Sequence, residues 1–449
     1  MQRRVVIVVV LTCCLILSMF AVSYSVTAKG KPSPSVRTVK NVILLIGDGM
    51  GIEHIDLTRI CTVGEDGKLN VDYLDEDPGW VATVSLSGVT NSAAAGTALA
   101  TGFMTKNGMI SVLPDGTVLE TVLERAESIG KSTGLVSSVA LTDATPAVFC
   151  SHTDYRGNYA YIAEQMAYAG VDVLLGSGEG YFLPIGEPMG MRLDGRNIIG
   201  EMQDMGYDYV ESRGELMNAN ADDGKLLGFF GGQWAQTYML DREARSNEPA
   251  LSEMTSKAIE VLNQDKDGFF LMVEGGAIDW LAHNRDPAGV VADTFEFDKA
   301  VGVALDFAKK DCNTLVLVTA DHETGALEID EKDVNTEYIN GITATTEFMW
   351  GLIESGEMDY ASAMSSYANI PKLTKIEKEC IELYGEGGIS DVISARANVE
   401  WGWSGMDNGD HTDTLVPVYA FGPNSNRFGG ELDNTEIGQL MFISISGSW

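Results

Sequence analysis

Three of the five histidines stand beside carboxylates, in positions that could bind a metal ion. They occur as Asp279 with His283, Asp321 with His322, and His411 between Asp410 and Asp413. The i, i+4 spacing of the first pair places both side chains on one face of a helix. Imidazole and carboxylate ligands without thiolate favour Zn²⁺ or a similar divalent ion. The joint placement of these groups, rather than any one of them, predicts a metal centre.

A second set of residues offers only oxygen ligands, which suit Mg²⁺. It consists of Asp48, Thr145 and Glu274, so more than one metal ion is expected. The other two histidines are assigned no metal. His54 follows a glycine-rich turn and is expected to be exposed, and His152 is expected to pack or to hydrogen-bond locally.

Ser92 begins a segment of small residues, SAAAGTALAT, that is expected to form a helix. A serine in this position is typical of an N-cap. A helix N-terminus also attracts phosphate and stabilises a negatively charged oxygen. The sequence therefore leaves two roles open for Ser92, a helix cap and a nucleophile.

Short apolar runs must position these residues. They span 42–46, 81–84, 134–141, 269–273, 315–319 and 416–421. Helical patterns separate them, which is typical of a mostly parallel sheet with helices on both faces. Five of the runs end in, or point towards, candidate residues, and His411 precedes the sixth. The prediction is an α/β three-layer sandwich whose site lies at the carboxyl ends of the strands.

The chain divides into four predicted regions. Arg3, Arg4 and an apolar run make residues 1–28 a secretory signal peptide, with an uncleaved anchor as the alternative. Residues 29–40 are a linker, 41–330 and 400–449 form the α/β domain, and 331–399 form a small helical insertion, or cap. Residues 181–232 are expected to form surface loops and short helices, and a last helix is expected to begin near Asp433.

Composition excludes several classes of protein. The 449 residues are 45% hydrophobic and 21% charged, which does not fit a disordered, collagen-like or polytopic membrane protein. A net charge of -35 disfavours nucleic acid as a structural partner. Beyond the signal region lie four widely spaced cysteines, Cys61, Cys150, Cys312 and Cys380. They contain no CxxC pair, and the sequence leaves open whether they form disulfides or lie in the core.

Six segments together resemble the alkaline phosphatase family, in the family's order and spacing. They are NVILLIGDGMG at 41–51, TNSAAAG at 90–96, DATPA at 143–147, VEGGAIDWLAH at 273–283, TADHETG at 319–325 and HT at 411–412. The resemblance extends from about residue 39 to 437, except for the insertion.

The resemblance implies two zinc ions and a third ion, normally magnesium. Asp279, His283 and His411 would hold one zinc; Asp48, Asp321 and His322 the other; and Asp48, Thr145 and Glu274 the third ion. Ser92 would be the nucleophile and form a phosphoserine intermediate, and Arg156 would bind the phosphate. Without the resemblance, Arg156 would be read as a solvated surface residue.

Three residues depart from the family pattern. Asn91 replaces an Asp of well-known bacterial members, which would deprive Arg156 of a carboxylate anchor. Trp280 stands where other members have Lys or His, and Thr324 replaces a second His. With Asp143 near the third site, the identity of that ion is open.

The expected function is that of a secreted, periplasmic or cell-surface phosphatase acting on small phosphate monoesters. Family members are often dimers, although no residue here demonstrates an interface. The alternatives are a phosphodiesterase or sulfatase of the same superfamily, and a non-catalytic acidic metal-binding surface protein. Ser92 fits the monoesterase pattern better than a diesterase, which commonly carries Thr, and neither Cys61 nor Cys150 begins a sulfatase motif.

Overall fold

A computed structural model describes residues 38–75, 78–221, 224–244, 247–402 and 411–449. A ten-stranded sheet runs through this part of the chain, in the order β16-β2-β15-β10-β1-β9-β5-β6-β8-β7. Its strands are β1 (Asn41–Gly47), β2 (Gly79–Ala82), β5 (Ser132–Ala140), β6 (Val173–Ser177), β7 (Asp208–Val210), β8 (Leu226–Phe229), β9 (Phe269–Gly275), β10 (Thr314–Ala320), β15 (Val416–Phe421) and β16 (Glu431–Asp433). Only β15 runs antiparallel to its neighbours. The predicted α/β fold with a mostly parallel sheet is confirmed.

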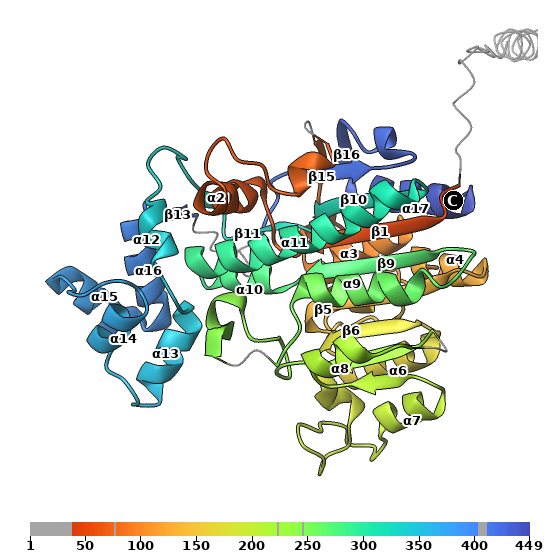
Figure 1. Ribbon diagram of the computed structural model, residues 1–449, viewed down its shortest axis with the longest axis horizontal. Coiled ribbons are helices and arrows are strands. Elements are labelled where there is room, and N and C mark those ends of the chain that lie inside the picture. Colours follow the sequence, from red (N-terminus) through yellow and green to blue (C-terminus); the bar gives the residue numbers. More distant parts are fainter. Residues whose placement is uncertain (1–37, 76–77, 222–223, 245–246, 403–410) are drawn as a thin grey trace, which may run out of the picture. The chain divides into compact units, whose positions relative to one another are not determined.

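The central strands are apolar along their whole length because helices cover both faces of the sheet. Every residue of β1, β9 and β10 is buried. In Figure 1, α9 (Leu251–Leu262) and α11 (Pro287–Asp311) pass in front of the sheet, and α3 (Ser92–Thr101) and α4 (Val122–Ser128) lie behind it. The last helix, α17 (Asn434–Ser446), packs against α3 and α4. Asp433 caps α17, as the sequence predicts.

The region 181–232 is predicted to form only loops and short helices, and the structure differs from this prediction. It contains β7 and β8, which extend the sheet in parallel beyond β6. Its helices are α7 (Ile198–Asp204) and α8 (Arg213–Asn218), and α6 (Tyr159–Ala169) precedes them. These edge strands have only three and four residues, too few for a periodic pattern, so pairing with β6 decides their structure.

The residues 331–399 form five helices, shown in blue in Figure 1 beside the carboxyl ends of the central strands. They are α12 (Thr336–Asn340), α13 (Thr346–Glu354), α14 (Tyr360–Ser366), α15 (Lys375–Tyr384) and α16 (Glu386–Ala397). Their apolar side chains share a cluster with Leu57 of α2 (Ile52–Thr62) and Ala288 of α11. The division of the chain at these boundaries remains an interpretation of the sequence.

Short elements complete the described fold. Three two-stranded ribbons pair β3 (Val84–Ser85) with β4 (Gly88–Val89), β11 (Glu323–Thr324) with β14 (His411–Thr412), and β12 (Leu327–Glu328) with β13 (Glu400–Trp401). The 3₁₀ turns are η1 (Val71–Tyr73), η2 (Glu179–Phe182), η3 (Met239–Ala244) and η4 (Ser425–Arg427).

The predicted signal peptide, and the predicted linker up to residue 37, lie outside the described residues. None of the helices in the described ranges has the length and apolar character needed to cross a membrane. The four cysteines of the described ranges are free: Cys61 and Cys150 are buried, Cys380 is half-buried and Cys312 is exposed.

Candidate metal centre

Four neighbouring strands carry candidate residues to one edge of the sheet, because their carboxyl ends point the same way. Asp321 and His322 follow β10, Asp48 follows β1, Glu274 lies near the end of β9, and Asp143 comes shortly after β5. All of these except Asp143 are at most 3% exposed.

Helices and a short ribbon add the remaining candidates. Asp279 and His283 share α10 (Ala277–His283), Thr145 lies in α5 (Ala144–Ala147), and His411 comes from β14, which pairs with β11. Ser92 is the first residue of α3, and its neighbour Asn91 is the N-cap, accepting a hydrogen bond from the backbone N–H of Ala94. Of the two roles that the sequence leaves open for Ser92, the helix cap is therefore taken by Asn91, and the Ser92 hydroxyl is not occupied in capping the helix.

The first group of potential ligands is Asp48, Asp321 and His322, whose donor atoms lie within 4.8 Å of one another. His322 Nε2 is 3.3 Å from Asp321 Oδ2 and 3.6 Å from Asp48 Oδ1. Ser92 Oγ lies 3.4 Å from the same imidazole nitrogen. A serine hydroxyl thus faces a buried set of ligands drawn from two strand ends.

The second group is Asp279, His322 and His411, also within 4.8 Å of one another. His283 belongs beside it, because its Nε2 is 3.2 Å from His411 Nε2 and 3.3 Å from Asp279 Oδ2. His322 stands in both groups, so the two candidate ion positions are neighbours.

The oxygen-only set begins with Thr145, whose hydroxyl donates to Asp48 Oδ2 at 3.4 Å. Glu274 accepts a short hydrogen bond from the Ser137 hydroxyl. Burial raises the pKa of Glu274 to about 8, although the hydroxyls of Ser137 and Thr145 oppose the shift. The structure therefore brings Asp48, Thr145 and Glu274 together in a third buried set next to the first.

Hydrogen bonds at the far side of each imidazole determine which nitrogen is available to a metal. The Thr324 hydroxyl donates to Asp279 Oδ1 at 2.5 Å, so it can only accept from His322 Nδ1, 3.2 Å away. His411 Nδ1 donates to the carbonyl of Thr90 at 3.0 Å. Both rings therefore direct an unprotonated Nε2 into the cluster. Thr324, which the sequence marks only as a departure, orients two ligands.

Burial and mutual repulsion dominate the electrostatics of these carboxylates. Burial, with repulsion from Asp321 and Asp279, raises the pKa of Asp48 well above its ordinary value, and burial raises that of Asp321 to about 7. Burial also raises the pKa of Asp279, but the neighbouring imidazoles outweigh this effect and hold it well below the usual range. Burial lowers the pKa of His322 and His411. The neutral imidazoles are in the state that binds metals.

Within the described part of the chain, some buried oxygen atoms of this cluster have no hydrogen-bond partner. They are Asp48 Oδ1, Glu274 Oε1 and Asp321 Oδ2. A buried, unpartnered carboxylate oxygen is costly unless a cation neutralises it. The ends of three neighbouring strands therefore each supply a buried oxygen that a divalent cation could neutralise, and the donor set fits the ions that the sequence predicts.

Gly49 allows the loop after β1 to approach α10 closely. It has a positive φ of 68°, and a Cβ here would lie 2.7 Å from Asp279 Oδ1 and 2.8 Å from Thr324 Oγ1. Any side chain would both strain the backbone and displace a potential ligand.

Arg156 borders the cluster and has a carboxylate partner. Its Nη2 donates to Asp143 Oδ1 at 2.7 Å. Asn91 instead accepts hydrogen bonds from the backbone N–H groups of Ala94 and Gly108. Asp143 therefore supplies Arg156 with a carboxylate anchor, and the effect of Asn91 on phosphate binding stays a prediction. The position of Asp143 shortly after the end of a strand is the feature of the sequence that could have predicted its place at the site.

The two remaining histidines lie away from the ligand groups. His54 is fully buried rather than exposed as predicted: its Nδ1 accepts from the backbone N–H of Gly51, and its ring contacts Trp401 edge to face. His152 forms local hydrogen bonds to the Ser111 carbonyl and to Glu124, as expected.

The fold and the site define the class of protein: an α/β protein whose sheet edge gathers two overlapping sets of potential metal ligands in front of a buried serine. The family described as alkaline phosphatase matches residues 39–446. Alkaline phosphatase 3 of Bacillus subtilis is 36% identical over 93% of this chain and 92% of its own length. The crystal structure of Thermus thermophilus alkaline phosphatase has a TM-score of 0.83 at 26% identity, covering 93% of both chains. A His135Glu variant of TAB5 alkaline phosphatase, with Mg bound in its M3 site, has a TM-score of 0.65 at 28% identity, covering 92% of this chain and 99% of its own.

The chain belongs to the alkaline phosphatase family. It is a phosphoric monoester hydrolase with candidate metal-binding groups at the carboxyl edge of its sheet.

Proposed function

We propose that this protein is an exported alkaline phosphatase that hydrolyses small phosphate monoesters through a phosphoserine formed on Ser92. The observation that carries the proposal is the position of the Ser92 hydroxyl, 3.4 Å from His322 Nε2, beside carboxylate oxygens that have no hydrogen-bond partner among the described residues. When bound, divalent cations supply Lewis-acid stabilisation of the attacking and leaving oxygens.

Two of the ions are proposed to be zinc. Asp279, His283 and His411 would hold one, and Asp48, Asp321 and His322 the other. The neutral imidazoles with Nε2 facing inward support this assignment, because mixed nitrogen and oxygen ligands suit Zn²⁺.

The third ion is proposed to be Mg²⁺, held by Asp48, Thr145 and Glu274. Three oxygen ligands without an imidazole favour this hard cation. The TAB5 variant with Mg in its M3 site gives a precedent within the family.

Ser92 and Arg156 have different roles in the proposed reaction. The Ser92 oxygen attacks phosphorus and forms a P–O bond while the alcohol departs, and water then cleaves the phosphoserine to release inorganic phosphate. Arg156 would hold oxygens of the phosphoryl group with its planar guanidinium, which Asp143 fixes in place. Ser92 needs no histidine base if cations lower the proton affinity of its hydroxyl.

The proposed location is outside the cytoplasm, in the periplasm, at the cell surface or in the medium. Its support is the charge and apolar pattern of residues 1–28 and the net charge of -35, which favours solubility in a salty medium.

One assay series tests the proposed reaction. The full chain is given 4-nitrophenyl phosphate, bis(4-nitrophenyl) phosphate and 4-nitrophenyl sulfate, each with and without EDTA. Hydrolysis of the monoester at least about 100-fold faster than of the other two, lost with EDTA and restored by Zn²⁺ and Mg²⁺, is the expected result. Preference for the diester or the sulfate would assign one of those reactions instead, and metal binding without turnover would indicate a non-catalytic protein.

A further inference from the structure

A groove of about 690 Å³ opens beside the candidate metal centre. One wall is the loop that follows β8, and the other is α13 of the insertion. Aromatic side chains line both walls and the end nearest the centre: Trp234, Tyr238, Trp280 and Phe348. Trp280 follows Asp279 directly on α10. The groove therefore begins one residue from a potential metal ligand.

The same groove also reaches the side of the centre where Arg156 lies. The ring of Trp234 contacts that of Tyr159 edge to face, with centroids 5.2 Å apart. Burial raises the pKa of Tyr159, the nearby Asp143 carboxylate raises it further, and Arg156 opposes the shift, so both charges lie within electrostatic range of this phenol. The carbonyl of Trp234 accepts from the N–H of Ala140, the last residue of β5. The group esterified to a phosphoryl held by Arg156 would therefore meet this aromatic wall.

The charge along the groove has one sign. Three carboxylates line it, Asp241, Glu347 and Glu357, and its described lining includes no Lys, Arg or His. Glu347 is exposed and accepts a hydrogen bond from the Tyr238 hydroxyl at 3.2 Å. Aromatic faces together with carboxylates are the combination that binds organic cations.

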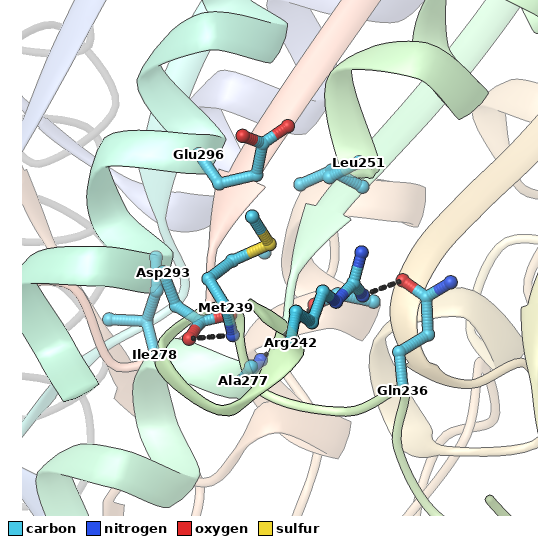
Figure 2. Close-up of a pocket in the computed structure, with 10 residues that line it drawn as sticks. Gln236, Met239, Arg242, Leu251, Ala277, Ile278, Asp293 and Glu296 are labelled. Carbon is cyan, nitrogen blue, oxygen red and sulfur yellow. Dashed lines mark hydrogen bonds between the residues drawn. The ribbon is translucent and has the colours of Figure 1, made fainter. Parts of the chain in front are cut away.

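Contacts behind the groove hold its walls in place. Figure 2 shows the pocket behind the loop, where Arg242 donates to Gln236 Oε1 at 3.1 Å and Asp293 accepts from the N–H of Met239 at 3.1 Å. Across the groove, Asp241 accepts two hydrogen bonds from Thr345, at the start of α13. The groove is thus formed before any ligand binds, which lowers the entropic cost of binding.

We propose that this groove is a subsite for the leaving group of the phosphate monoester, and that it favours planar leaving groups carrying a positive charge. This inference rests on the proposed phosphatase function, because the groove is assigned to the alcohol side of the same ester.

The test compares three aryl phosphates whose leaving phenols carry different para substituents: 4-trimethylammonio (cationic), 4-nitro (neutral) and 4-sulfonato (anionic). For each ester, the kcat/KM of a variant is divided by the kcat/KM of the wild-type protein, so that differences in the intrinsic reactivity of the esters cancel. The variants are Glu347→Gln, which keeps an acceptor for Tyr238, and Trp234→Ala. Glu354→Gln is the control, because Glu354 is exposed on α13 but does not line the groove.

We expect Glu347→Gln to lower kcat/KM for the cationic ester about 3-fold, to raise it about 2-fold for the anionic ester, and to change the neutral ester least. Trp234→Ala should lower kcat/KM about 5-fold or more for the cationic ester and less for the other two. The changes in kcat/KM caused by Glu347→Gln should become smaller in 1 M NaCl, which screens the charge. Glu354→Gln should change kcat/KM by the same factor for all three esters.

The outcomes separate the two proposals. Equal changes on all three esters, or a cationic preference that Glu354→Gln removes as well, would overturn the subsite while leaving the phosphatase proposal intact. A wild-type protein that hydrolyses none of the three esters would overturn the phosphatase proposal and the subsite with it.

Discussion

Two largely buried groups of charged residues in this protein are stabilised in opposite ways. Behind the groove, Arg242 donates to the carbonyls of Thr237 and Pro249 and to Gln236 Oε1, so the chain itself satisfies the guanidinium. At the sheet edge, Asp48, Glu274 and Asp321 each keep an oxygen that no described residue partners. The first group is complete within the chain, whereas the second needs cations from outside. A structural cluster of charges has hydrogen-bond partners within the chain, whereas a catalytic cluster keeps charged atoms that are free to bind a ligand.

The largest effect should come from removing the serine at the sheet edge. Ser92→Ala is expected to lower kcat for 4-nitrophenyl phosphate about 10³-fold or more, because no other hydroxyl lies beside His322 Nε2 in the described site. Thermal unfolding should change little, since Asn91 caps α3. Ser128→Ala, at an exposed serine of α4, is the control. Retention of more than a tenth of the activity would exclude Ser92 as the nucleophile.

Removing the guanidinium behind the groove should affect stability instead. Arg242→Met is expected to lower the free energy of unfolding by about 2–4 kcal/mol, because it removes three hydrogen bonds, to Thr237, Pro249 and Gln236, together with the positive charge near Asp293 and Glu248. Urea unfolding followed by circular dichroism measures it. The loss should be the same with and without EDTA, which separates this group from the metal centre. Arg213→Met, at an exposed ion pair with Glu253, should cost much less.

The effect of Asp321→Asn on the free energy of unfolding should change sign when metal is bound. In EDTA the variant is expected to be more stable than the wild-type protein by about 2 kcal/mol, because it removes a buried charge near Asp48 and Asp279. Its amide can also donate to His322 Nε2, 3.3 Å from the present Oδ2. With Zn²⁺ bound the variant should be the less stable protein, since it has lost a ligand. Unfolding midpoints that move in the same direction under both conditions would argue against a metal at this position.

The pH dependence of stability should reveal the cost of burying Asp293. Burial raises its pKa to about 7, so between the unfolded value of about 4 and pH 7 the folded state binds more protons. Its contribution to the free energy of unfolding is therefore present at low pH and lost as pH rises through 7. Asp293→Asn should be more stable than the wild-type protein by about 1.5 kcal/mol at pH 8, and by much less at pH 5.5. An equal difference at both pH values would contradict this reading.

The smallest effect concerns the anchor of Arg156. Asp143→Asn weakens the hydrogen bond that fixes the guanidinium, so Ki for inorganic phosphate should rise about 3- to 10-fold. Asn91→Asp should change Ki less than about 2-fold, because either side chain accepts from Ala94 and Gly108. A larger response to Asn91→Asp than to Asp143→Asn would restore residue 91 as the anchor.

Sequence reasoning succeeded where a local pattern has one physical cause. The runs that became β1, β9 and β10 are apolar throughout because both faces of these strands are buried, and each leads into polar residues at the same edge. It failed where a distant partner decides the outcome. The ring of buried His54 contacts Trp401, which is far away in the sequence, and β8 and then β7 add to the edge that β6 offers.

The order of strands, loops and ligand-bearing residues could be read from the chain itself, because hydrophobic periodicity and strand-end polarity are short-range properties. The partners of those residues could not. The Thr324 hydroxyl orients Asp279 from 45 positions away. Asn91 caps α3, and Asp143 rather than residue 91 binds Arg156. Hydrogen bonds act over about 3 Å in space whatever the separation along the chain, so only the folded structure decides which donor meets which acceptor.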